Sequence, residues 1–182
     1  DQIRESLEKS QLKTMRERKV DMTIFSPIAG QMGHHIGNLI TSQRWSVHCN
    51  NLIHRVTNLY PKNFIGVCQL PQSTGVSPKN SAAELERCVK ELGFKGVLLN
   101  PDPYENSGEE APPLGDRYWY PLYEKLCEYD IPAHIHGTGS HSERTPYTLH
   151  FINEESIAVF GLLTGRNSVA FVATALPTAG GA

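Results

Sequence analysis

The feature that most constrains the fold is a regular alternation of short apolar runs with helical patterns. The apolar runs predict strands at residues 20–25, 64–70, 96–100, 131–136 and 169–176. Apolar residues at helical spacing predict helices at residues 1–19, 41–60, 81–92 and 116–129, and a further helix that begins at Asn153. This order predicts an α/β fold with parallel strands and outer helices.

Two architectures fit five such strands: a doubly wound sheet, or an arc of an eight-stranded barrel. A closed barrel of that type typically needs about 250 residues, and the chain has 182. No Gly-x-Gly-x-x-Gly motif follows the first strand, so a dinucleotide-binding fold has no support.

Composition excludes some classes of partner. The net charge of -2 gives no basic surface for nucleic acid. No run approaches the ~20 apolar residues that span a bilayer. The cysteines form no Cys-x-x-Cys pair, which predicts reduced, mostly buried thiols in a cytoplasmic protein.

Three local signals predict helix boundaries. Ser81-Ala-Ala-Glu84 has the pattern of a capping box. Gly93 is placed to end the helix that follows. Pro121 lies inside the helix predicted at 116–129, so we expect the first turn of that helix to be separate or kinked.

A His-x-His pair lies at the end of the strand predicted at 131–136. Residues two apart in a strand point to the same face, so His134 and His136 are expected to project together. Parallel α/β folds place their chemistry at this end of the strands. With His141 nearby, the pair suits a divalent metal such as zinc. The alternative is a hydrogen-bonded polar layer in the core, and the pair alone leaves both open.

A second group of histidines, His34 and His35, lies in the glycine-rich loop 30–37 after the first strand. This doublet fits either a substrate-binding loop or a solvated turn.

Six segments of the chain carry a family resemblance: FSPIAGQMGHHIGN, LYPKNFIGVCQLPQS, ELERCVKELGF, LLNPDP, DRYWYPLYEKLCEYDIPAHIH and LHFINEES. Together they resemble the 4-oxalomesaconate hydratase group of the amidohydrolase superfamily, which is related to aminocarboxymuconate-semialdehyde decarboxylase. They occur in the family's order over most of residues 11–165.

The resemblance implies a (β/α)₈ barrel with one catalytic divalent metal, usually zinc. The strands here then correspond to numbers two to six, within a single domain over residues 1–182 that is truncated at both ends. His136 matches the family's metal ligand on strand five, whereas His134 falls at a position that is usually apolar.

Three departures from the family follow from the same alignment. The first-strand His-x-His is absent. The sequence at residues 178–182 is TAGGA where the family has a histidine-led motif, and Ile28 stands where the hydratase commonly has an arginine. One aligned imidazole remains, whereas catalytic zinc usually takes three protein ligands.

The resemblance implies a metal-dependent hydratase or lyase that acts on a small polycarboxylic acid from aromatic ring cleavage. Its candidate acids and bases are His34, His35, His150 and Asp102. Asn100 and Arg117 are candidates to hold the substrate carboxylates. The structural alternatives are that Asp102 only caps a turn between two prolines, and that Arg117 pairs with Asp116 or a nearby glutamate.

A non-catalytic protein is the second functional hypothesis. Because the chain departs from the family's ligand set, it also fits a truncated paralogue that binds a partner chain. The open strand edges of a barrel arc need covering, so we expect an oligomer or association with another chain.

Overall fold

The computed structural model describes residues 2–27, 37–104, 107, 109, 111–136 and 171–174. The helices are α1 (Gln2–Lys9), α2 (Gln11–Arg18), α3 (Leu39–Leu59), α4 (Ala82–Lys90) and α5 (Tyr120–Tyr129), with 3₁₀ turns η1 (Pro78–Ser81) and η2 (Arg117–Trp119). The strands are β1 (Thr23–Phe25), β2 (Phe64–Gly66), β3 (Cys68–Gln69), β4 (Val97–Leu99), β5 (Ala133–His136) and β6 (Phe171–Thr174).

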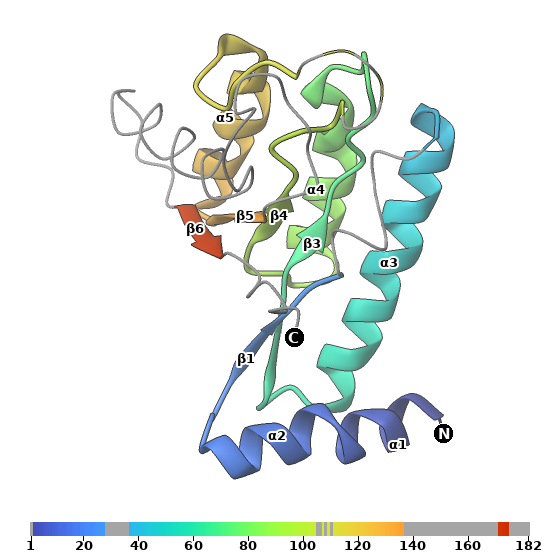
Figure 1. The fold of residues 1–182 in the computed structure, drawn as a ribbon, viewed down its shortest axis with the longest axis vertical. Helices are drawn as coiled ribbons and strands as arrows, with labels where there is room; N and C mark the ends of the chain where they lie inside the picture. Colours follow the sequence, from blue (N-terminus) through green and yellow to red (C-terminus); the bar gives the residue numbers. More distant parts are fainter. Residues whose placement is uncertain are drawn as a thin grey trace, which may run out of the picture.

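All the described strands pair in parallel and in chain order. β1 pairs with β2, and β3, β4, β5 and β6 follow one another in a second sheet (Figure 1). This confirms the predicted α/β fold with parallel strands. A doubly wound sheet reverses its strand order at one point, and no such reversal occurs among the described strands.

The strand predicted at 64–70 is divided at Val67. Its first half pairs with β1, and the Val67 N–H still donates to the carbonyl oxygen of Phe25 at 3.1 Å. One residue later the Cys68 N–H donates to the carbonyl oxygen of Gly96 at 3.0 Å, and the second half pairs with β4. The same segment therefore changes neighbours at Val67, and this joins the two sheets.

The main core lies between the second sheet and three helices, α3, α4 and α5, which cover one side of it (Figure 1). The strand residues in this core alternate along each strand: Cys68 on β3, Val97 and Leu99 on β4, and Ala133 and Ile135 on β5. The intervening residues Val67 and Leu98 contact each other in a separate buried cluster. They therefore belong to the opposite face of the sheet.

Helix α3 confirms the helix predicted at 41–60. The Asn38 side chain caps it by accepting a hydrogen bond from the Thr41 N–H at 3.0 Å. Three of its apolar residues are buried, Cys49, Ile53 and Val56, while Trp45 and Leu52 are exposed. Even this longest helix is not apolar enough for a bilayer, and none of the other described helices is a candidate span.

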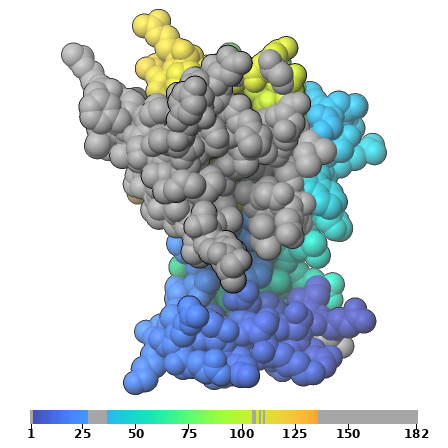
Figure 2. All heavy atoms as spheres, viewed as in Figure 1, coloured from blue at the N-terminus to red at the C-terminus, as the bar shows by residue number. Residues whose placement is uncertain are grey.

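The N-terminal helix predicted at 1–19 is two helices, so that prediction is wrong at Ser10. The Ser10 hydroxyl donates to the carbonyl oxygen of Ser6 at 2.6 Å, a bond of the kind that bends helices. Both helices pack against the start of β2 through Leu7, Leu12 and Phe64. They lie across the lower end of the molecule (Figures 1 and 2), next to the starts of β1 and β2.

The capping box predicted at Ser81 is absent. The Ser81 hydroxyl donates instead to the carbonyl oxygen of Pro71 at 2.9 Å, and the Glu84 side chain bonds to Asn50 and Arg87. These distant partners compete successfully with the local backbone.

Two other boundary predictions are confirmed. Gly93 has a φ of +71° just after α4, as a helix-ending glycine requires. Pro121 lies in the first turn of α5 and the separate turn η2 precedes it.

The strands predicted at the two ends of the chain differ in length from those described. The strand predicted at 20–25 begins only at Thr23, and the strand predicted at 169–176 is described at Phe171–Thr174. The helix predicted from Asn153 lies outside the described residues.

A close contact at Gly66 leads to a first prediction. A Cβ atom at this position would lie 2.6 Å from two ring carbons of the buried Phe94 side chain. We expect Gly66→Ala to lower the free energy of unfolding by about 1–3 kcal/mol, as overpacked cores do. Urea titration measures it. If the Phe94 ring causes the loss of stability, Gly66→Ala should destabilise a Phe94→Leu protein less than it destabilises the unsubstituted protein. An equal loss of stability in the two proteins would contradict this explanation.

The cysteines lead to a second prediction. All four are free; Cys49, Cys68 and Cys88 are buried and Cys127 is exposed. Burial raises the pKa of the Cys49 thiol to about 11, so it carries little reactive thiolate at neutral pH. We expect a thiol-specific aromatic disulfide reagent to modify one cysteine in the folded protein and four after unfolding. Cys127→Ser should abolish the fast reaction, and a second fast thiol would contradict the buried positions.

Candidate functional site

The candidate site lies where β3, β4 and β5 end. Because parallel strands point the same way, their carboxyl ends meet at one edge. β3 ends at Gln69, and Asn100 follows directly after β4. Leu99 pairs with Ile135 and His136 pairs with Thr174. Asn100 and His136 each come one residue after the Leu99–Ile135 pair, so they lie at the same level of this edge.

One layer of residues crosses the sheet just below this edge. Gln69 pairs with Leu98, Leu98 with His134 and His134 with Val172. Leu98 belongs to the face opposite the helices, as described above. The alternation of strand residues assigns Gln69 and His134 to the same face, on either side of Leu98. By the same alternation we expect position 136 on this face, and the joint projection of the His-x-His side chains stays a prediction.

The side-chain amide of Gln72 satisfies both backbone hydrogen-bonding groups of Asn100. The Gln72 amide donates to the Asn100 carbonyl oxygen at 3.0 Å, and its oxygen accepts from the Asn100 N–H at 3.0 Å. This pair of bonds replaces the ladder that a neighbouring strand would supply at this point. The backbone of Asn100 is therefore held although β4 has already ended.

Asn100 and Asp102 are buried and build the turn that contains Pro101 and Pro103. The Asn100 side-chain oxygen accepts from the Asp102 N–H at 2.9 Å. The Asp102 carboxylate accepts from the Tyr104 N–H at 3.1 Å. These bonds are Asx turns, so the structural alternative for Asp102 is realised. A catalytic role for Asp102 and a substrate-binding role for Asn100 stay predictions.

Further hydrogen bonds join the loops after β3 and β4. The Thr74 hydroxyl donates to the Pro103 carbonyl oxygen at 3.1 Å, and the Tyr118 hydroxyl donates to the Val76 carbonyl oxygen at 2.7 Å. Burial raises the pKa of the Tyr118 hydroxyl, so it stays a proton donor at neutral pH. These hydrogen bonds hold the loops after β3 and β4 together beside the edge at which the site is expected.

Asn50 of α3 holds the end of β3 from the helix side. Its amide donates to the Gln69 carbonyl oxygen at 2.9 Å and its oxygen accepts from the Gln69 N–H at 2.8 Å. The amide also donates to Glu84 at 2.7 Å. Both carboxylate oxygens of Glu84 accept from Arg87, at 2.8 and 2.7 Å.

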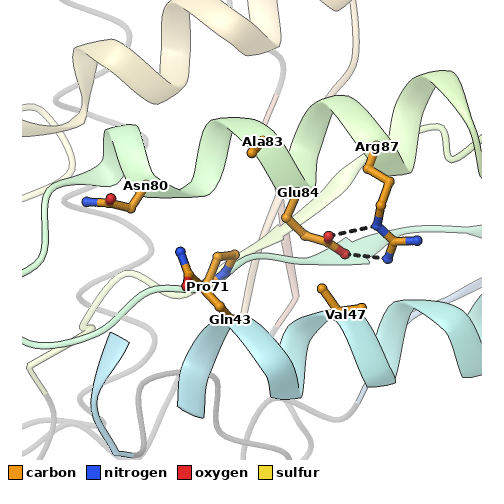
Figure 3. A pocket seen from close by; sticks show the side chains of 7 residues that line it. All are labelled: Gln43, Val47, Pro71, Asn80, Ala83, Glu84 and Arg87. Carbon is orange, nitrogen blue, oxygen red and sulfur yellow. Dashed lines mark hydrogen bonds and ion pairs between the residues drawn. The ribbon is translucent and has the colours of Figure 1, made fainter. Parts of the chain in front are cut away.

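The Glu84–Arg87 pair borders a pocket of about 240 Å³ between α3 and α4 (Figure 3). The remaining lining residues are Gln43, Val47, Pro71, Asn80 and Ala83. None of the predicted site residues lines this pocket, which lies on the helix side of β3.

Arg117 is exposed in η2, directly before α5. The predicted alternative, a pair with Asp116, is not formed: the Asp116 carboxylate accepts instead from the Tyr118 N–H at 2.7 Å. No ion pair joins Arg117 to another residue in the described part of the chain. Its role in holding a substrate carboxylate stays a prediction.

The remaining candidates lie outside what the structure describes. His34, His35, His141 and His150 fall in ranges 28–36 and 137–170, and for His136 only the backbone is described. Among the described residues, no group of three or more histidine, cysteine, aspartate or glutamate side chains is arranged to hold a metal ion.

Sequence reasoning missed the three amides that organise this edge, those of Asn50, Gln69 and Gln72. A signal was present for two of them. Asn50 lies on the buried face of α3, and Gln69 interrupts the otherwise apolar run Val67-Cys-Gln-Leu70. A polar residue at a core position indicates a specific partner or a function.

Comparison with known proteins adds a family and several relatives. A family model described as amidohydrolase matches residues 1–161. A 2-keto-4-carboxy-3-hexenedioate hydratase from a Sphingobium species is 49% identical over 168 residues, which cover 91% of this chain and 49% of the relative. A γ-resorcylate decarboxylase from a Polaromonas species is 39% identical over 79 residues, 42% of this chain and 22% of that protein.

Solved structures of related enzymes are also similar to this chain. A 4-oxalomesaconate hydratase from Rhodopseudomonas palustris is 43% identical with a TM-score of 0.73, over 89% of this chain and 44% of that one. A dihydroxybenzoic acid decarboxylase from a Polaromonas species, solved with manganese and 2-nitroresorcinol, has a TM-score of 0.71 over 84% of this chain and 48% of its own. At 24% identity it shows the fold alone. The chain spans about half the length of the hydratases it matches.

Proposed function

The chain belongs to the amidohydrolase family, and we propose that it forms part of a metal-dependent hydratase for a small polycarboxylic acid from aromatic ring cleavage. One observation carries the choice of reaction. The hydratase relative is 49% identical over 91% of this chain, whereas the decarboxylase relative is 39% identical over only 42%. This difference favours water addition over loss of carbon dioxide, and it disfavours the non-catalytic alternative.

The proposed architecture is an arc of the family's (β/α)₈ barrel within a single domain over residues 1–182. β1 would be barrel strand two, β2 with β3 would be strand three, and β4, β5 and β6 would be strands four to six. The parallel pairing in chain order supports this assignment, as does the position of the helices on one side of β3–β6.

The proposed metal ligand is His136, at the carboxyl end of β5. An imidazole is a common ligand for zinc and other divalent ions, but the described residues form no ligand cluster, so further ligands would come from outside them. We propose zinc, with manganese as the competing ion because three solved structural neighbours hold it. When bound, such an ion polarises a water or a substrate oxygen.

Hydration needs groups that move protons and groups that hold carboxylates. The oxygen of water bonds to one carbon of the double bond and a proton is added to the neighbouring carbon, so a base and an acid are required. We propose Asp102, His34, His35 and His150 as the candidates for these two roles. Arg117 suits bidentate contact with one carboxylate, and Asn100 would hold another.

The test is hydration of 4-oxalomesaconate by the protein that carries this chain, with zinc or manganese added to metal-depleted samples. We expect the absorbance of the conjugated double bond to fall only when metal is present. Release of carbon dioxide from 2,6-dihydroxybenzoate is the parallel assay. Decarboxylation without hydration would replace this proposal with the second reaction of the family.

A further prediction concerns association. Among the described strands β1 pairs with β2 alone. Ile24 within β1 and Met22 just before it expose apolar side chains. An unpaired edge of this kind favours pairing with another chain. We therefore expect light scattering on the purified chain to give a mass above that of a monomer, and a monomeric mass would contradict this prediction.

A further inference from the structure

The side chain of Gln69 is fully buried, and its amide has no hydrogen-bond partner among the residues that the structure describes. Its exposed fraction is 0%. In the part of the chain that the structure describes, neither the side-chain nitrogen nor the side-chain oxygen makes a hydrogen bond. The backbone of the same residue is fully engaged, because Asn50 bonds to both its N–H and its carbonyl oxygen. The residue is therefore held firmly while its amide remains available.

The position of this amide relates it to the proposed site. Gln69 is the last residue of β3, and its register partner Leu98 is in turn the partner of His134. Gln69 and His134 thus lie two strands apart on the face opposite the helices. Neighbouring strands are separated by about 4.8 Å, so Gln69 and His134 are roughly 10 Å apart, and the proposed ligand His136 follows two residues later at the carboxyl end of β5.

An unpartnered buried amide is unfavourable for folding. Buried polar groups in native proteins are nearly always hydrogen-bonded, and the exceptions call for an explanation such as a functional role. A methionine of similar length would fill the same space without the cost of burying two polar atoms. The amide is expected to find its partner in a molecule that enters the site.

We propose that Gln69 is a substrate-binding residue whose side-chain N–H groups donate hydrogen bonds to a carboxylate of the polycarboxylic substrate. Its oxygen is then free to accept from the hydroxyl group that hydration creates. This assignment rests on the proposed hydratase function. It gives the site a neutral donor that supplements Arg117 and Asn100 and that selects substrates by the position of the carboxylate.

The test compares two glutamines that are three residues apart. Gln69→Met removes an amide without partners, and Gln72→Met removes one that bonds twice to Asn100. With 4-oxalomesaconate as substrate, we expect Gln69→Met to raise KM roughly 10- to 100-fold, with an unchanged or higher melting temperature. We expect Gln72→Met to lower the melting temperature. Gln69→Leu serves as a second apolar variant if Gln69→Met does not fold.

Two outcomes would overturn the inference. In the first, Gln69→Met lowers the melting temperature as Gln72→Met does and leaves KM unchanged, which would make the amide structural. The second outcome is found by calorimetry, which measures binding of 4-oxalomesaconate alone and is used if the unsubstituted protein does not hydrate this compound, so that the proposed function fails. Equal affinity of the unsubstituted protein and Gln69→Met, or no binding to either protein, would then overturn the inference. A loss of affinity in Gln69→Met would support it.

Discussion

Replacing His136 with alanine is expected to lower kcat/KM for hydration roughly 10³-fold and to deplete the protein of its divalent metal. The residue ends β5 at the edge where the parallel strands terminate, and it is the proposed ligand from this strand. A metal ion contributes several kcal/mol of charge stabilisation to a transition state, and each 1.36 kcal/mol is a factor of ten in rate. Metal content by mass spectrometry and steady-state kinetics on the same samples measure both effects.

Two further histidine variants make this result interpretable. His48→Ala is the matched control, since His48 is exposed on α3 beside Trp45, and it should change neither metal content nor rate. His134→Ala tests the other member of the His-x-His pair. If His136 alone is the ligand, His134→Ala keeps the metal. A His136→Ala protein with its full metal content would contradict the ligand assignment.

Replacing Asn50 with leucine is expected to lower the free energy of unfolding by about 3–5 kcal/mol. The substitution leaves the N–H and the carbonyl oxygen of Gln69 without partners inside the protein. It also removes a 2.7 Å hydrogen bond to the buried Glu84 carboxylate. Each unsatisfied buried group costs about 1–3 kcal/mol, and bonds to charged groups are the stronger ones. Leucine is similar in volume, so the lost hydrogen bonds dominate the effect.

Asn51→Leu is the matched control for this prediction. Asn51 is the next residue of α3, is exposed, and accepts one hydrogen bond from Arg87 at 3.0 Å. Surface substitutions of this kind usually change the free energy of unfolding by no more than about 0.5 kcal/mol. Urea titration of both variants gives the comparison. Equal stabilities of the two variants would show that the Asn50 network contributes little.

Much of the fold follows from periodicity. Apolar residues at spacings of two and of three to four predict the strands, α3 and α5, because burial of one face determines these elements. Pro121 predicts a separate first turn for the same reason that proline breaks helices elsewhere. The division at Val67 does not follow from periodicity, because it depends on which strand lies on either side.

The capping-box error has its physical origin in distant partners. Ser81 and Glu84 have the spacing of a capping box, but Pro71 and Asn50 offer them stronger tertiary bonds. The Gln72–Asn100 pair joins residues 28 apart in sequence. Such contacts are invisible to local patterns.

The candidate site was predictable in its location and less so in its residues. Strand alternation is enough to predict that positions 134 and 136 share a face, and Asn100 does follow a strand end. The turn role of Asp102 is one of two interpretations that the sequence leaves open, whereas the matching role of the Asn100 side chain is not predicted from it. The sequence also does not reveal that the side-chain amide of Gln69 is buried with no hydrogen-bond partner in the described part of the chain.

The most direct test of the account is the reaction run in water enriched in the heavy oxygen isotope, with 4-oxalomesaconate as substrate and the product analysed by mass spectrometry. A hydratase transfers one solvent oxygen to carbon, so the account predicts a product that carries one heavy hydroxyl oxygen and retains every carboxylate. A product that has lost carbon dioxide and has gained no solvent oxygen at carbon would contradict it.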